Sequence, residues 1–210
     1  MKLCDLIIER DYNFNIWAYA RIDTVKEEYL ETLKKAGVNW LALGIESGNK
    51  VVRQDVVKGK FTEVNIVDLV AKVQDHDINV IGNYIFGLPE DNLETMQDTL
   101  DMSIELNCEF ANYYSAMAYP GSKLYLDALK EGWELPETYV GYSQHSYETS
   151  PLPTKHISAA EVLKFRDEAF IKYYKNESYL GMIEKKFGHS TRQGIEKMTE
   201  IKLKRKLLGD

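Results

Sequence analysis

Short apolar runs alternate with longer amphipathic stretches along the first 130 residues. The short runs are rich in β-branched and aromatic residues and are bounded by polar or turn-forming residues, a pattern typical of buried strands. They predict strands over residues 15–22, 40–45, 79–86 and 110–117.

The stretches between these runs carry apolar residues three and four positions apart, which predicts helices. We expect these helices at about residues 24–36, 62–75, 91–104 and 122–130, and a polar loop from the second strand through Gly59. Thr24 with Glu27, and Asp91 with Glu94, have the spacing of a capping box. Gly37 is expected to end the first helix.

Regular alternation of strand and helix predicts a parallel sheet with right-handed crossovers. Four such units make half of an eight-unit barrel or an open curved sheet. The predicted fold class is therefore α/β, a partial TIM-like (β/α) barrel. Neither edge of a four-stranded piece would be closed, which suggests an incomplete unit.

The rest of the chain has a different pattern. Residues 131–156 are rich in Tyr, Ser, Pro and Gly and predict an irregular linker or lid. Ser158 with Glu161 then predicts a capped helix, followed by helices near 179–187 and 191–207. We expect three parts: a partial barrel at 1–130, a linker at 131–156 and a helical appendage at 157–210.

Composition narrows the classes of function. The formal net charge of −7 argues against a nucleic-acid partner. The basic residues near the end are expected on a solvated helix face; they are Lys197, Lys202, Lys204, Arg205 and Lys206. No apolar run is long enough for a membrane span or a signal peptide, so we expect a cytoplasmic protein. Cys4 and Cys108 are too few to hold an iron–sulfur cluster or zinc by themselves.

Polar and turn-forming residues gather where the predicted strands end, which is where parallel barrels carry their sites. They are Arg21 and Asp23, residues 46–49, residues 87–90 and residues 118–121.

Alternation along the strands sorts these residues by face. Glu46 shares a face with Gly44 and Ala42, whose small side chains would leave room for a ligand beneath the carboxylate. Asn83, Ile85 and Gly87 share a face of the third strand, as Trp17, Tyr19 and Arg21 share one of the first.

Four of these segments resemble, in order, the later strands of radical S-adenosylmethionine (SAM) enzymes. They are AYARID at 18–23, GIESGN at 44–49, NYIFGLPED at 83–91 and AYPGSKLY at 118–125. The third resembles the motif G-x-I-x-G-x-x-E, with Asn83 in place of its first glycine. RDEAFIKYY at 166–174, with SYL at 178–180, is similar to the tail of members that carry an N-terminal cobalamin-binding domain.

The resemblance implies roles in SAM binding for residues of the first two strands. Glu46 and Ser47 would meet the ribose or the methionyl polar groups. Arg21 would pair with the methionyl carboxylate, which suits a guanidinium. Two simpler interpretations stay open: Glu46 caps its loop or pairs with Lys50 or Lys58, and Arg21 forms a salt bridge within the barrel wall.

The later strands would complete the same wall. Asn83 and Ile85 would face the ligand, with Ile85 beside the adenine and Gly87 keeping the backbone close. Backbone groups near Tyr119 would meet the adenine edge. Glu90 would hold its turn together. A simpler interpretation also stays open, in which residues 87–89 form only a tight turn.

The sequence departs from the family in lacking the C-x-x-x-C-x-x-C motif whose cysteines bind a 4Fe–4S cluster. In the family an electron from this cluster cleaves SAM, and the deoxyadenosyl radical abstracts hydrogen from a small-molecule substrate. The first two strand–helix units are absent as well. We therefore expect a truncated chain, a chain whose partner supplies the other half, or a protein that has lost the activity.

Three functions follow from this. The first is a fragment of a radical SAM oxidoreductase or transferase, with cobalamin in a missing N-terminal domain as an option. The second is a non-catalytic binding or scaffolding domain. The third is an unrelated barrel enzyme acting on a phosphorylated small molecule, although the chain has no glycine-rich phosphate loop.

Overall fold

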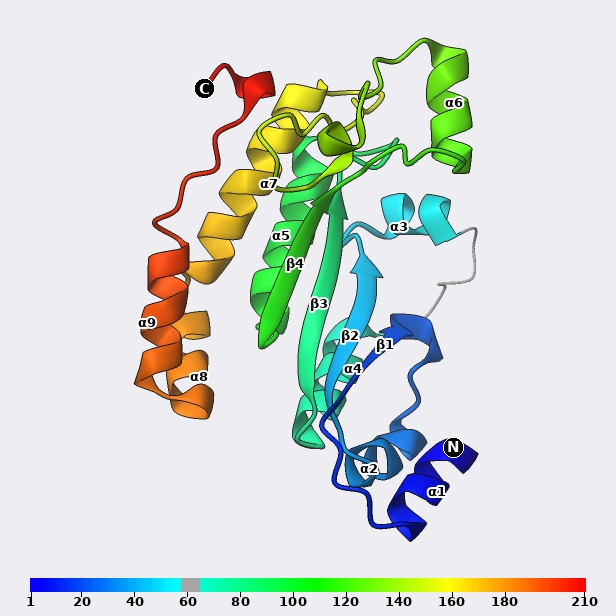
Figure 1. Cartoon of the computed structure of the whole chain (residues 1–210), viewed down its shortest axis with the longest axis vertical. Coiled ribbons are helices and arrows are strands. Elements are labelled where there is room, and N and C mark those ends of the chain that lie inside the picture. The colour runs from blue at the N-terminus through cyan, green and yellow to red at the C-terminus, as the bar shows by residue number, and fades with distance from the viewer. Residues whose placement is uncertain (58–64) are drawn as a thin grey trace.

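The computed structural model describes residues 1–57 and 65–210, without the side chains of 54–57. Its centre is a parallel sheet in the strand order β1-β2-β3-β4 (Figure 1). The strands are β1 (Ile16–Arg21), β2 (Val38–Glu46), β3 (Asn79–Phe86) and β4 (Phe110–Ser115). The α/β class, the four predicted strands and their parallel arrangement are confirmed.

One face of this sheet is covered by helices. Leu41, Leu43 and Ile45 of β2 point into a core shared with α2 (Glu27–Lys35), α4 (Ile66–Asp75) and α5 (Leu93–Leu106). Alternate residues point the other way, and there Trp17 and Tyr19 remain exposed. The sheet therefore has one face covered by helices and an opposite, largely uncovered face among the described residues. On this second face Ala42 and Ile81 are buried, and Trp40 stacks on Phe187 with ring centroids 5.8 Å apart.

Two of the predicted capping boxes are wrong. Helix α2 has Lys26 at its N-cap, and the Thr24 hydroxyl instead donates to the Arg21 carbonyl in the short 3-10 turn η1 (Ile22–Thr24). Helix α5 is capped by Asn92, which forms a capping box with Thr95. Asn92 suits the N-cap of α5 as well as Asp91 does, whereas the Lys26 side chain makes no capping hydrogen bond to α2.

The predicted loop after β2 contains a helix, α3 (Lys50–Val57). The Asn49 side chain starts it by accepting from the Val51 and Val52 N–H groups at 3.1 and 3.2 Å. The loop's remaining residues, 58 and 59, and the predicted helical positions 62–64 lie outside the described residues. Helix α4 begins at Ile66, with Asn65 as its N-cap.

The C-terminal third packs onto the sheet. After α6 (Lys123–Glu131) and an irregular segment with the 3-10 turn η2 (Tyr139–Tyr142), helix α7 (Ala159–Tyr174) lies against β4 and α5. The capping box of Ser158 and Glu161 at its start is confirmed. Ala169, Tyr173 and Tyr174 of α7 join the core of the sheet.

Helices α8 (Glu177–Phe187) and α9 (His189–Met198) follow α7. The predicted helix over 191–207 is wrong beyond Met198: the chain runs back along α7 to the short turn η3 (Lys206–Leu208), as Figure 1 shows. Arg205 of this segment is fully buried, so the expected solvated basic face is also wrong at this position. Because Arg205 is buried against α7, the segment after Met198 runs along α7 and is not helical.

Side chains occupy the outer edge of β4, contrary to the expectation that both edges would be open. The Tyr174 hydroxyl donates to the Ala111 carbonyl and accepts from the Ala111 N–H, at 2.8 and 3.1 Å. The Gln144 amide pairs in the same way with the N–H and carbonyl of Ser115. These bonds replace a neighbouring strand at that edge.

Helix α1 (Lys2–Glu9), which precedes β1, has no buried residue, and its Leu3 and Leu6 side chains are exposed.

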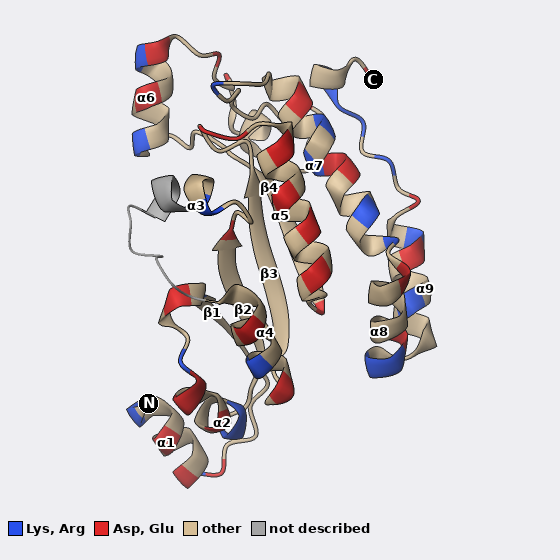
Figure 2. Ribbon diagram, turned by 180° about the vertical axis from the view of Figure 1, so that it is seen from behind, with Lys and Arg blue, Asp and Glu red and all other residues tan. Residues whose placement is uncertain are grey.

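Charged side chains are unevenly distributed over the helices. Viewed from behind, acidic residues line the outward side of α5, whereas basic residues are scattered along the C-terminal segment (Figure 2).

Candidate functional site

A row of four residues crosses the uncovered face near the carboxyl ends of the strands. The register aligns Arg21 with Gly44, Gly44 with Asn83, and Asn83 with Asn112. Asn112 Nδ2 donates to Asn83 Oδ1 at 3.0 Å, and Asn83 Nδ2 donates to the Leu43 carbonyl at 3.2 Å. The row is therefore a polar strip with a gap at Gly44.

Glu46 fills this gap. A bulge at the end of β2 gives Glu46 a positive φ of 67° and turns its side chain back over Gly44. A β-carbon on Gly44 would lie only 2.7 Å from Glu46 Oε1, so the carboxylate needs the glycine beneath it. Burial raises the pKa of Glu46.

The Glu46 carboxylate has no hydrogen bond or ion pair with any residue that the structure describes. Pairing with Lys50, one of the simpler interpretations, is not observed, and Lys58 lies outside the described residues. A partly buried carboxylate without a partner can accept hydrogen bonds from a ligand or attract a cationic group.

The turn after Glu46 is attached to α5. Thr99 Oγ1 accepts from the Gly48 N–H at 2.9 Å and lies 3.2 Å from Ser47 Oγ. Arg53 Nη1 donates to the Ser47 carbonyl at 2.6 Å. Ser47 is thus fully buried, with its hydroxyl against α5 and not on the uncovered face.

The turn after β3 is equally tied to its surroundings. Gly87 has a φ of +80°, and a β-carbon there would lie 2.5 Å from Val162 Cγ1 of α7. Buried Asp91 accepts from the Leu88 N–H at 2.9 Å and from Thr95 Oγ1 at 2.7 Å, while burial raises its pKa. Glu90 forms an ion pair with Lys155.

The remaining predicted site residues lie around the strip. Arg21 forms a two-pronged ion pair with Asp23, both contacts 2.6 Å long, as the salt-bridge interpretation predicted. Ile85 packs with Val52, Leu88 and Ala116. Tyr119 is exposed and stacks on Tyr142 with ring centroids 6.0 Å apart.

The structure thus brings Arg21, Glu46, Asn83 and Ile85 to the uncovered face, whereas Ser47, Gly87 and Glu90 shape the turns behind its rim. Sequence reasoning missed Asn112, Tyr114 and Thr99. Alternation along the predicted fourth strand would have found Asn112 and Tyr114, because they share a face two residues apart. No local signal points to Thr99, which reaches the site from a different element.

In residues 1–57 and 65–210 no group of three or more His, Cys, Asp or Glu side chains could hold a metal ion. Cys108 is buried, and burial raises its pKa to about 12, so it remains a thiol. No helix in this part of the chain is long and apolar enough to cross a membrane.

Comparison with known proteins gives a family match. Residues 7–103 match the family model of the radical SAM superfamily. The chain is 24% identical over 157 residues to an uncharacterized methyltransferase of Pyrococcus horikoshii, covering 75% of this chain and 33% of that protein. It is 26% identical over 119 residues to bacteriochlorophyllide d C-12(1)-methyltransferase of Chlorobaculum tepidum, covering 54% and 26%.

Among solved structures, coproporphyrinogen III oxidase of Escherichia coli, described as a radical SAM enzyme, gives a TM-score of 0.48. Its identity to this chain is 21%, and the match covers 68% of this chain and 41% of that one. The chain spans a third or less of the length of the two curated relatives named above.

Proposed function

Because residues 7–103 match the family model of the radical SAM superfamily, we propose that this chain belongs to that superfamily and that the uncovered face of its sheet forms part of the wall of a SAM-binding site. The observation that carries the proposal is Glu46, a half-buried carboxylate held over Gly44 without a partner among the described residues. It faces the polar strip at the strand ends, where parallel α/β proteins bind ligands.

The residues on this face suit the parts of SAM. The Glu46 carboxylate would accept from the ribose hydroxyls or the methionyl ammonium group. Asn83 adds amide groups, and Ile85 offers an apolar surface to the adenine. Arg21 would pair with the methionyl carboxylate in competition with Asp23. Backbone groups near Tyr119 would meet the adenine edge.

The 4Fe–4S cluster does not fit this chain by itself. The whole sequence has two cysteines, and the three-cysteine motif is absent. We therefore propose that a preceding segment or a partner chain supplies the cluster ligands. A cluster held by those other residues would supply the electron for radical chemistry on SAM, while this chain would hold SAM through Arg21, Glu46 and Asn83.

Two relatives are named as methyltransferases, which favours group transfer to a small molecule as the reaction of the complete assembly. The tail resembling cobalamin-dependent members supports cobalamin as a further cofactor, bound outside residues 1–210. Residues 1–130 would serve as the partial barrel, 131–156 as a lid and 157–210 as a helical appendage.

SAM binding to the 210-residue chain, measured by isothermal titration calorimetry, tests the proposal. We expect the wild type to bind and Glu46→Gln to weaken binding about tenfold or more, since it removes a charged hydrogen-bond acceptor. Glu31→Gln is the matched control, because Glu31 is exposed on α2. Absence of binding by the wild type, or equal binding by both variants, would contradict the proposal.

A second assay separates SAM binding from SAM cleavage. After anaerobic reconstitution with iron, sulfide and a reductant, we expect no deoxyadenosine from this chain alone. Deoxyadenosine formation would show that the cluster assembles without added residues. Binding without cleavage under all reconstitution conditions, even with the cysteine-bearing segment added, would instead favour the non-catalytic binding domain.

A further inference from the structure

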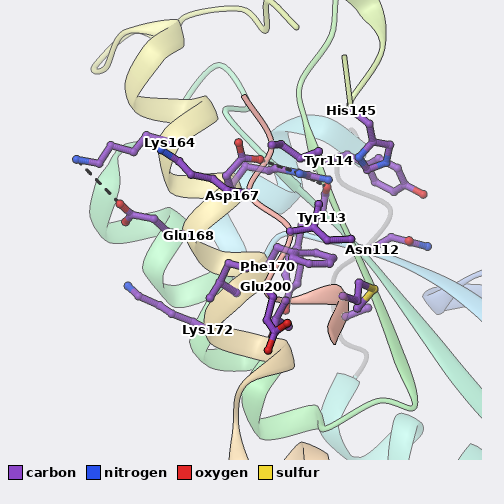
Figure 3. Close-up of a pocket in the computed structure, with 18 of the residues that line it drawn as sticks. Asn112, Tyr113, Tyr114, His145, Lys164, Asp167, Glu168, Phe170, Lys172 and Glu200 are labelled. Carbon is purple, nitrogen blue, oxygen red and sulfur yellow. Dashed lines mark hydrogen bonds and ion pairs between the residues drawn. The ribbon is translucent and has the colours of Figure 1, made fainter. Parts of the chain in front are cut away.

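A cavity of about 1090 Å³ lies outside the proposed SAM site, between the outer edge of β4, helix α7 and the C-terminal segment. Its lining is mainly apolar, with Phe110, Phe170, Ile171, Met198, Ile201 and Leu203 along its length. Figure 3 shows Asn112, Tyr114 and His145 at one side and Phe170 and Glu200 at another. This volume is slightly larger than the usual range for small-molecule sites, about 300–1,000 Å³.

Two buried arginines beside this cavity share one carboxylate. Arg205 of the C-terminal segment and Arg166 of α7 are 0% and 4% exposed, and both bond to Asp167. Two guanidinium groups against one carboxylate leave a local excess of one positive charge at Asp167. Elsewhere the lining carries acidic and basic side chains in equal number, which are Glu168, Glu200, Asp210, Lys164, Lys172 and Lys202. Burial and these guanidinium groups lower the pKa of His145 at the same side.

The two guanidinium groups differ in how far their hydrogen bonds are satisfied. Arg205 donates from all three nitrogens, to Asp167, the Ser146 and Gln144 carbonyls and Thr149 Oγ1. Arg166 uses only Nε, to the Tyr113 carbonyl at 2.8 Å, and Nη1, to Asp167 at 2.8 Å. Its Nη2 donates to no residue in the described part of the chain.

A backbone donor lies at the same place. Alternate residues of β4 direct their N–H and carbonyl groups to the outer edge. Side chains occupy both groups of Ala111 and both groups of Ser115. Tyr113 lies midway between them. Its carbonyl accepts from Arg166 Nε, but its N–H donates to no side chain of the described residues. Arg166 and Tyr113 both line the cavity.

We propose that this cavity binds a small molecule with an extended apolar body and a carboxylate group. Its carboxylate would accept from Arg166 Nη2 and the Tyr113 N–H and balance the excess positive charge, since a guanidinium edge matches a carboxylate. Its apolar body would lie between the edge strand and the C-terminal segment. Asn112 and Tyr114 belong both to this cavity and to the uncovered face, so the ligand would lie beside the polar strip.

This site needs neither SAM nor the cluster, so binding can be measured on the 210-residue chain by itself. The probe is cis-parinaric acid, a polyene fatty acid whose fluorescence rises in apolar surroundings, used below its self-association concentration. Its methyl ester has the same apolar body without the charge. We expect the acid to bind at one site per chain at least about tenfold more tightly than the ester.

Arg166→Met should weaken binding of the acid about tenfold or more and leave the ester unchanged. Circular dichroism and thermal unfolding establish that the variant is folded. Arg192→Met, on α9 and away from the cavity, is the matched control and should bind as the wild type does.

A pair of variants at an exposed position keeps the test independent of Arg166. Ile201 is 67% exposed at the cavity, so its replacement should not disturb the fold. Ile201→Asp should weaken binding of the acid more than Ile201→Asn does, because only the aspartate adds a negative charge. Failure of the acid to bind, equal binding of acid and ester, or equal effects of both Ile201 variants on the acid would each overturn the proposal.

Discussion

The Cγ1 atom of Val162 lies 2.5 Å from the place that a β-carbon on Gly87 would occupy. This contact joins α7 to the turn after β3. Gly87→Ala should therefore add overpacking of about 1–3 kcal/mol to a backbone strain of about 1–2 kcal/mol, measured by urea unfolding.

Gly121 provides the control, because it has a similar φ of +85° but nothing within 4 Å of its ideal β-carbon. Gly121→Ala should be destabilised by the backbone strain alone. Val162→Ala in the Gly87→Ala background should recover part of the overpacking cost. Equal losses for the two glycine variants would show that Val162 can move aside.

Thr99 should control the rim turn without touching a ligand. Thr99→Val removes the acceptor of the Gly48 N–H and the partner of Ser47, leaving buried polar groups unpaired at about 1–3 kcal/mol. We expect lower stability and weaker SAM binding. Thr99→Ser retains the hydroxyl and should restore most of both. If Thr99→Ser is as damaging as Thr99→Val, the losses do not follow the hydroxyl, and the prediction is wrong.

Glu46 should lower stability at neutral pH. Burial raises its folded pKa above the unfolded value, so its protonated form favours folding below the unfolded pKa, and this contribution is lost as pH rises through the folded pKa. Glu46→Gln should thus be more stable than the wild type near neutrality, with the difference shrinking toward about pH 4.

The comparison is made by urea unfolding across pH. Glu31→Gln should show the opposite sign, since Lys35 lowers the pKa of Glu31 and the ionised form favours the folded state. A wild type as stable as Glu46→Gln at every pH would mean that the carboxylate is better solvated than the structure indicates.

Tyr174 should protect the outer edge of β4. Tyr174→Phe leaves both the N–H and the carbonyl of Ala111 without a partner and should cost about 1–3 kcal/mol. An unpaired edge also invites strand addition, so aggregation should rise in light scattering. Tyr173→Phe, which loses only a bond to the Cys108 carbonyl, should leave aggregation unchanged.

Asp167 should be essential for attaching the C-terminal segment. Asp167→Asn leaves two buried guanidinium groups without a counter-charge and should cost about 3–5 kcal/mol. Limited proteolysis should then cut after Met198. Glu196→Gln, which weakens a solvent-accessible pair with Arg192, should cost less than about 1 kcal/mol and leave the segment protected.

The sequence by itself determined the strands and most helices, because their signals are local. The apolar run at 79–86 matches β3 residue for residue, and the capping box of Ser158 and Glu161 starts α7 as expected. Alternation along the first strand also placed Arg21 with Trp17 and Tyr19 on one face, whereas Glu46 reaches its place over Gly44 through a bulge and a positive φ that alternation does not predict.

Tertiary structure decided which of several suitable local partners was used. Asn92 and not Asp91 caps α5, because Asp91 is needed to close the preceding turn. The segment after Met198 looked helical from its charge pattern, yet burial of Arg205 against Asp167 holds it extended along α7.

The same distinction between local sequence signals and tertiary packing applies to the residues of the site. Motifs in the sequence predicted the rim residues, but a motif does not say which way a side chain points. Contacts between distant segments turned Ser47 toward Thr99, required glycine at position 87 through Val162, and left Glu46 without a partner among the described residues. These outcomes depend on how whole elements pack. Packing brings together residues that are far apart along the chain, and no local sequence pattern specifies which of them meet.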